Sequence, residues 1–123
     1  MKQVLLVFIG GGVGSVLRYI VGKFTKIPAS GFPWSTFHVN VLGSLLIGIL
    51  MGITLKNSSF SENQTLLLIT GLCGGFTTFS AFAYENQIFL KEGDFTNFFI
   101  YTLGSIGVGL AAVFFGLFIS KSF

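Results

Sequence analysis

The chain has 123 residues, of which 52% are hydrophobic and only 9% are charged. Soluble domains average about 25% charged residues, so the composition excludes a water-soluble globular protein and indicates an integral membrane protein. The formal net charge of +3 is too small and too dispersed to indicate nucleic-acid binding. The single cysteine, Cys73, excludes an intrachain disulfide, and no basic neighbour in the sequence suggests a catalytic thiol.

Uncharged runs along the chain predict the membrane spans. They cover residues 3–17, 27–55, 63–84 and 95–120. A transmembrane helix needs about 20 apolar residues, and the first run reaches that length if it continues past Arg18 to Gly22. It is then too long for a cleavable signal peptide, so we keep it as a mature helix. We therefore predict an all-α membrane protein with a single domain over 1–123 and four transmembrane helices near 3–22, 34–55, 65–90 and 96–119.

Small residues recur at helical spacing on three of the predicted helices. They are Gly10 and Gly14 on the first, Ser44, Gly48 and Gly52 on the second, and Ser105, Gly109, Ala112 and Gly116 on the fourth. Such stripes let helix backbones approach closely in lipid. We expect some of them to pack helices within one chain and one or two to lie at an interface between chains.

On the first helix, Arg18 lies about one turn from the end. Two roles stay open for it: its side chain snorkels to the interface, or it concentrates an anion at a pore mouth.

On the second helix, Thr36, Asn40 and Gly43 share one face. Asn40 either ties two helices together through its amide or lends an N–H to a permeating anion. His38 is assigned to packing or to the interface, because a metal or haem site needs more ligands.

The third predicted helix contains two adjacent glycines, Gly74 and Gly75, followed by two threonines and a serine. Glycine weakens a helix by roughly 1 kcal/mol relative to alanine. We therefore predict a break near Gly74-Gly75, and we expect that a side chain at Gly74 would crowd this break. A break at membrane depth leaves backbone groups that protein, water or an ion must satisfy, and such breaks form ion and substrate sites.

Aromatic and polar side chains follow the predicted break. Phe79 and Phe82 share a face, and ring edges carry positive potential that an anion can approach. Glu85 lies one turn further on, where it either bonds hydroxyls of this motif or pairs with Arg18. On the fourth helix, Tyr101, Ser105 and Gly109 form a second polar face.

The distribution of cations barely distinguishes the two possible orientations in the membrane. Four helices place both termini on one side, which carries Lys2, Lys56 and Lys121, while the other carries Lys23, Lys26 and Lys91, with Arg18 one turn inside. The positive-inside rule needs an imbalance. Either another feature sets the orientation, or the chain inserts both ways and pairs as an antiparallel dimer. Four packed helices leave no lumen, which favours a partner if the chain conducts an ion.

The motifs resemble those of the Fluc (CrcB) family of small fluoride channels. The run Gly74-Gly75-Phe76-Thr77-Thr78-Phe79-Ser80-Ala81-Phe82 is similar to the family's GG-x-TTFS-x-F. Gly14 to Tyr19 resembles its G-x-x-x-R-Y, and Trp34 to Gly43 resembles its second-helix motif, with Asn40 matched. The resemblance covers essentially the whole chain.

The resemblance implies an antiparallel, dual-topology homodimer with two fluoride pathways along its interface. It implies that Phe79 and Phe82 line each pathway, with Asn40 as a polar contact and with hydroxyls from Thr36, Ser80, Tyr101 and Ser105. It also implies one central structural Na⁺, bound by the backbone carbonyls of Gly74 and Thr77 of both subunits.

The expected function is passive export of cytoplasmic fluoride across a cell membrane. Of the two roles left open for Arg18, the one that serves this function places it in the vestibule of the pathway. No nucleotide-binding loop or catalytic constellation is visible, so we expect no enzyme. The alternative is a small multidrug or guanidinium exporter of similar size and topology. Such exporters depend on a buried carboxylate in the first helix, and this chain has none there.

Overall fold

A computed structural model describes residues 1–28, 31–56 and 60–123, and all regular structure in these residues is helical. Three of its helices are α1 (Lys2–Phe24), α2 (Trp34–Lys56) and α6 (Phe95–Ser120). The remaining span, Glu62–Lys91, is composite: α3 (Glu62–Thr65), the π-helix η1 (Leu66–Cys73), α4 (Gly74–Phe76) and α5 (Phe79–Lys91). Within the described residues these give four spans that are long and apolar enough to cross a membrane, which confirms the predicted class.

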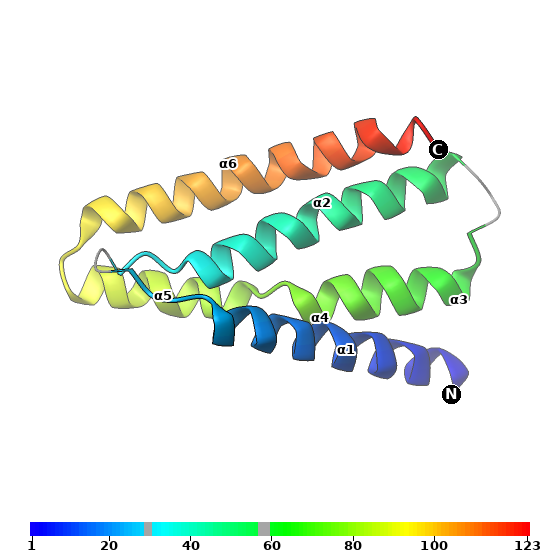
Figure 1. Cartoon of the computed structure of the whole chain (residues 1–123), viewed down its shortest axis with the longest axis horizontal. Coiled ribbons are helices and arrows are strands. Elements are labelled where there is room, and N and C mark those ends of the chain that lie inside the picture. Colours follow the sequence, from blue (N-terminus) through cyan, green and yellow to red (C-terminus); the bar gives the residue numbers. More distant parts are fainter. Residues whose placement is uncertain (29–30, 57–59) are drawn as a thin grey trace.

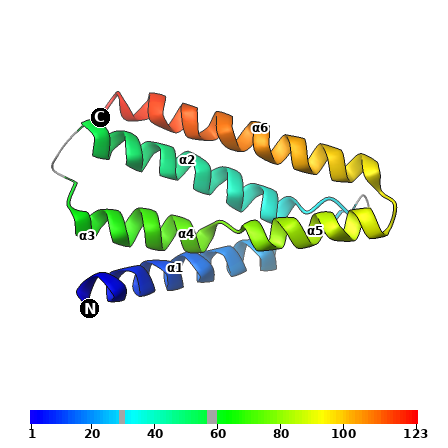
Figure 2. The same ribbon diagram turned by 180° about the vertical axis from the view of Figure 1, so that it is seen from behind.

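The spans lie side by side in one layered bundle (Figures 1 and 2). α2 packs chiefly on α6, and α1 packs chiefly on η1 and α4. The composite span therefore lies between α1 and α2, and both termini emerge at the same end of the bundle (Figure 1).

Glycines allow the helix backbones to touch at both of these contacts. A Cβ atom at Gly14 would overlap the carbonyl oxygen of Leu72, and one at Gly75 would overlap that of Gly11. Between α2 and α6, a Cβ atom at Gly48 would overlap the Val113 carbonyl oxygen. These stripes therefore pack helices within one chain. By contrast, a Cβ atom at Gly12, Gly104 or Gly107 would meet nothing within 4 Å.

The predicted break in the third span exists, but it lies after the glycine pair. Gly74 and Gly75 are helical, whereas Thr77 (φ −83°, ψ 159°) and Thr78 (φ −151°, ψ 115°) are extended. The expected crowding at Gly74 is also not found within the chain, since a Cβ atom there would have the Ile69 carbonyl oxygen, at 4.0 Å, as its nearest neighbour. The crowded glycine is Gly75, because it touches α1.

Two local motifs define the ends of the third span. At its start, Ser61 and Gln64 form a reciprocal capping box. At its end, Gly93 adopts φ 73°, and the N–H groups of Gly93 and Asp94 donate to the carbonyls of Leu90 and Phe89. This is the Schellman pattern, for which glycine is preferred because of its positive φ. The tight turn returns the chain into α6 and places Tyr101 beside α5.

We expect Gly116→Ala to lower the thermal stability of the purified protein by about 1–3 kcal/mol, because its Cβ atom would overlap the Leu45 carbonyl oxygen and force α2 and α6 apart. Gly12→Ala on α1 is the matched control, since it brings the same gain in helix propensity and its Cβ atom would meet nothing within 4 Å. Thermal unfolding in detergent compares the two. Equal stability of both variants would contradict backbone contact between α2 and α6.

Candidate functional site

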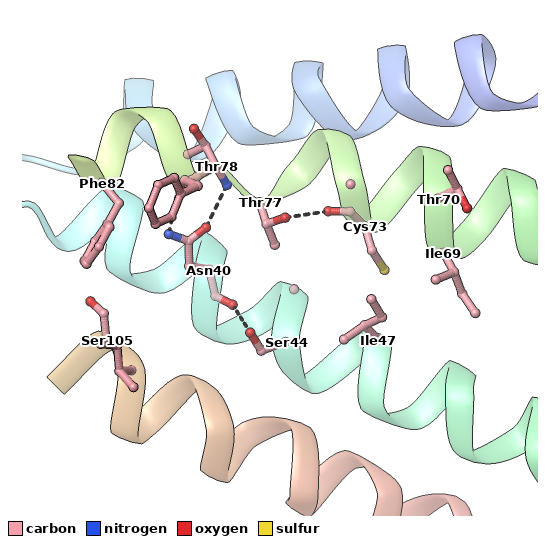
Figure 3. A pocket seen from close by; sticks show the side chains of 14 residues that line it. Asn40, Ser44, Ile47, Ile69, Thr70, Cys73, Thr77, Thr78, Phe82 and Ser105 are labelled. Atoms are coloured by element: carbon pink, nitrogen blue, oxygen red, sulfur yellow. Dashed lines mark hydrogen bonds between the residues drawn. The ribbon is translucent and has the colours of Figure 1, made fainter. Parts of the chain in front are cut away.

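Asn40 of α2 satisfies the backbone at the break through both ends of its side-chain amide. Its Oδ1 accepts from the N–H of Thr78 at 2.8 Å, and its Nδ2 donates to the carbonyl of the same residue at 3.2 Å. Figure 3 shows this pair beside the interrupted ribbon. Of the two roles left open for Asn40, the structure establishes the interhelical tie. Only one of the two N–H donors of the side-chain amide is used in this pair, so the second N–H remains to bind another group.

The break opens onto a groove of about 520 Å³ between the composite span, α2 and α6 (Figure 3). None of its lining residues carries a charge; they are Asn40, Gly43, Ser44, Ile47, Ile69, Thr70, Cys73, Gly74, Thr77, Thr78, Phe79, Phe82, Ser105 and Ile106. We call this hollow the central groove. Its surface offers amide, hydroxyl and carbonyl groups in an otherwise apolar wall.

Two aromatic rings lie at the start of α5, where they line the central groove. Phe79 is 79% exposed in the single chain, and its ring centroid lies 5.8 Å from that of Phe82. The Phe82 ring lies 5.0 Å from that of Tyr101, which is fully buried. Phe82 therefore links the central groove to the buried hydroxyl of Tyr101.

Glu85 joins three helices beyond this ring. Its carboxylate accepts from the Thr36 hydroxyl of α2 and from the Tyr101 hydroxyl of α6, each at 2.8 Å. The sequence leaves open whether Glu85 bonds hydroxyls of the motif after the break or pairs with Arg18; the structure shows it bonding hydroxyls of α2 and α6 instead. Thr36 and Glu85 also line a second groove of about 410 Å³, whose rim includes Lys26. We call it the end groove, because it lies where α1 ends and α2 begins.

Arg18 contacts the break from the side of α1. Its Nε donates to the Gly75 carbonyl at 3.2 Å, and the Ser15 hydroxyl approaches the same oxygen at 3.5 Å. Arg18 lines neither the central groove nor the end groove. Its vestibule role stays a prediction, whereas its contact with the backbone is part of the structure.

The remaining predicted hydroxyls differ in their surroundings. The Ser105 hydroxyl is buried, lines the central groove and has no hydrogen-bond partner among the described residues. Figure 3 shows it directed toward Phe82. Ser80 is exposed, and its hydroxyl lies 3.3 Å from that of Thr78. His38 lies beside the Trp34 ring, 5.6 Å between centroids, which agrees with its packing role.

Two contributors to the site were not predicted from the sequence. Thr78 caps α5, because its hydroxyl accepts from the N–H of Ala81 at 3.2 Å. The preference of helix N-caps for threonine was a usable signal. Two roles were left open for Glu85, and neither named the hydroxyls of Thr36 and Tyr101, since no local pattern shows that two hydroxyls from other helices converge on it.

We expect Asn40→Asp to reduce thermal stability by about 1–3 kcal/mol, because a carboxylate oxygen would then face the Thr78 carbonyl oxygen in place of an N–H donor. Ser44→Ala on the same helix is the control, as it removes a bond only to the Asn40 carbonyl one turn earlier. Thermal unfolding of the two variants measures the difference. Wild-type stability in Asn40→Asp would contradict a structural role for the amide pair.

Comparison with known proteins agrees with this architecture. Residues 5–117 match the family described as CrcB-like protein, Camphor Resistance (CrcB). A protein named fluoride-specific ion channel FluC from Azobacteroides pseudotrichonymphae is 45% identical over 100% of this chain and 99% of its own length. Proteins of the same name from Phocaeicola vulgatus and Chlorobaculum tepidum are 43% and 45% identical, each over 98% of this chain and over 100% and 96% of their own lengths. The chain therefore belongs to the CrcB-like family.

Proposed function

We propose that the chain is a fluoride-selective channel that exports fluoride by passive electrodiffusion across a bacterial plasma membrane. The observation that carries the proposal is the central groove, which lies at a helix break and offers hydrogen-bond donors without a fixed charge. The names of the full-length relatives support fluoride as the permeant ion. The four membrane-length spans support a multi-pass protein.

The groove has the chemistry that a dehydrated small anion requires. Fluoride holds its water strongly, so a pore must replace that water with donors while still releasing the ion. The unpaired Ser105 hydroxyl and the second N–H of Asn40 are available donors. The first residue of α5 is Phe79, and the positive end of this helix dipole lies at the groove. The edges of the two phenylalanine rings add positive potential.

The proposed pathway continues from the central groove past Phe82 and Tyr101 to the end groove. Along it, the hydroxyls of Thr36 and Tyr101 donate to Glu85 in the conformation described. Each hydroxyl has one proton, so it serves fluoride only when the carboxylate releases it. Lys26 at the rim of the end groove supplies a positive charge that concentrates anions there.

We further propose that two copies pair in antiparallel orientation and cover the central groove. In the single chain the groove is open, and Phe79 in its wall is largely exposed. Gly104 and Gly107 on α6 leave space for a close helix contact. The cations are also balanced, with three lysines at each end of the bundle and Arg18 one turn inside.

A structural Na⁺ fits the oxygen donors at the break. Among the described residues no group of three or more His, Cys, Asp or Glu side chains is placed to hold a metal. The donors would instead be the backbone carbonyls of Gly74 and Thr77, residues that line the central groove. Carbonyl oxygens suit small hard cations. When bound, the ion would supply the positive charge that freed carbonyls at membrane depth require.

Fluoride efflux from liposomes containing the purified protein tests the function, with chloride as the comparison ion. We expect fluoride efflux without a proton gradient, which also separates a channel from a proton-coupled exporter. Phe79→Ile and Phe82→Ile retain an apolar side chain but remove the ring edge, so each is expected to reduce fluoride efflux at least about tenfold while the dimer persists.

Phe8→Ile, at a 74% exposed position of α1 outside both grooves, is the control for these variants and should conduct normally. Dimer content is measured on the same preparations by size-exclusion chromatography. No fluoride efflux from the wild-type protein would refute the function. Normal efflux in both pathway variants would refute the role of the rings.

Dual topology is tested by adding charge to one end at a time. Gln3→Lys with Ser122→Lys adds two lysines at the end that carries the termini, and Gln87→Lys with Thr96→Lys adds two near the other end. We expect each double variant alone to insert in one orientation and lose efflux, and the two together to restore it. Full activity of either variant alone would contradict antiparallel pairing.

A further inference from the structure

Two backbone amides at the break are diverted from the carbonyls that they would cap in a continuous helix. There, the N–H of each residue donates to the carbonyl four residues earlier. The Thr78 N–H would therefore pair with the Gly74 carbonyl, and the Ala81 N–H with the Thr77 carbonyl. Instead, the Thr78 N–H donates to Asn40 Oδ1 at 2.8 Å, and the Ala81 N–H donates to Thr78 Oγ1 at 3.2 Å.

The Gly75 carbonyl, which lies between those of Gly74 and Thr77 in the sequence, has a side-chain donor. Gly75 lies beside α1, where its carbonyl accepts from Arg18 Nε at 3.2 Å. Gly74 and Thr77 line the central groove, and Gly75 does not. Side chains from α1, α2 and the break itself therefore divide the carbonyls into one that is paired with a cationic side chain and two that have lost their helical donors.

We infer that Asn40 and Thr78 are positioning residues for the cation site, because they remove the two N–H groups that would compete with a cation for the carbonyls of Gly74 and Thr77. This inference rests on the proposed Na⁺ site and extends it. Asn40 does so through its side-chain oxygen and Thr78 through its hydroxyl. Neither side chain has to touch the ion.

The hydroxyl of Thr78 gives the sharper test, because Asn40 also belongs to the proposed fluoride pathway. Thr78→Val keeps the shape of the side chain but removes the acceptor of the Ala81 N–H. The Ala81 N–H then has no acceptor unless it donates to the Thr77 carbonyl, so a cation must compete with this N–H for the carbonyl oxygen. Thr78→Ser keeps the acceptor. Thr54→Val is the matched control, since its hydroxyl donates to the Leu50 carbonyl within α2, away from the break.

The measurement is the Na⁺ concentration that gives half-maximal thermal stabilisation of the purified protein in detergent, with N-methyl-D-glucamine as the replacing cation and no fluoride present. We expect this concentration to rise about tenfold in Thr78→Val, from the usual strength of a helix N-cap, and to stay within about twofold in Thr78→Ser and Thr54→Val. A general loss of packing would lower the melting temperature without shifting this concentration.

The outcomes separate the inference from the proposed site. If the melting temperature of the wild-type protein does not change with Na⁺ concentration, both the cation site and the inference are refuted. If Na⁺ stabilises the wild-type protein but the half-maximal Na⁺ concentration is the same in Thr78→Val, the inference alone is refuted. Failure of Thr78→Val to assemble at every Na⁺ concentration would also overturn it, because added Na⁺ should compensate for a weakened site.

Discussion

An interrupted helix in hydrocarbon requires a partner for every backbone group that it frees, since each unsatisfied group costs several kcal/mol. In this chain the interruption is at Thr77 and Thr78. Its partners come from Asn40 of α2, from Arg18 of α1 and from the Thr78 side chain itself. The break therefore depends on how closely α1 and α2 pack against the composite span. The glycine contacts and the polar groove form one system, because a shift at Gly14 or Gly75 would withdraw a hydrogen-bond partner from the break.

The helices could be predicted well from the sequence because charged residues are excluded from the membrane interior, so the uncharged runs between them mark the spans. Helix α2 was expected near 34–55 and runs Trp34–Lys56. The break was expected near Gly74-Gly75 because glycine disfavours helix, but tertiary packing overrode that propensity. Both glycines remain helical, and Gly75 serves the contact with Gly11. The chain leaves the helix at Thr77, and a threonine cap at Thr78 begins the next one.

The candidate site was predicted as a set of residues but not as a network. Asn40, Phe79, Phe82 and Ser105 were each identified from a helical face or a motif, and they line one groove. What these residues bond to was hidden, because their partners lie on other helices. Thr36 and Tyr101 were expected as donors to an anion, yet both protons are directed to Glu85. The periodicity of a sequence shows which residues share one face of a helix. Which acceptor those residues contact depends on how the three helices pack together.

The position of Arg18 suggests how an anion site avoids becoming a trap. A guanidinium inside a dry groove would hold an anion tightly, because charge interactions strengthen as the dielectric constant falls. Here the Arg18 side chain donates to the Gly75 carbonyl, outside the lining of the central groove. The groove receives instead the end of the α5 dipole, equivalent to roughly half an elementary charge, together with neutral hydroxyl and amide donors. Conduction requires binding strong enough to admit the ion and weak enough to release it. The contact that stabilises the break thus also keeps a full positive charge out of the groove, so one hydrogen bond serves both the fold and the proposed release of fluoride.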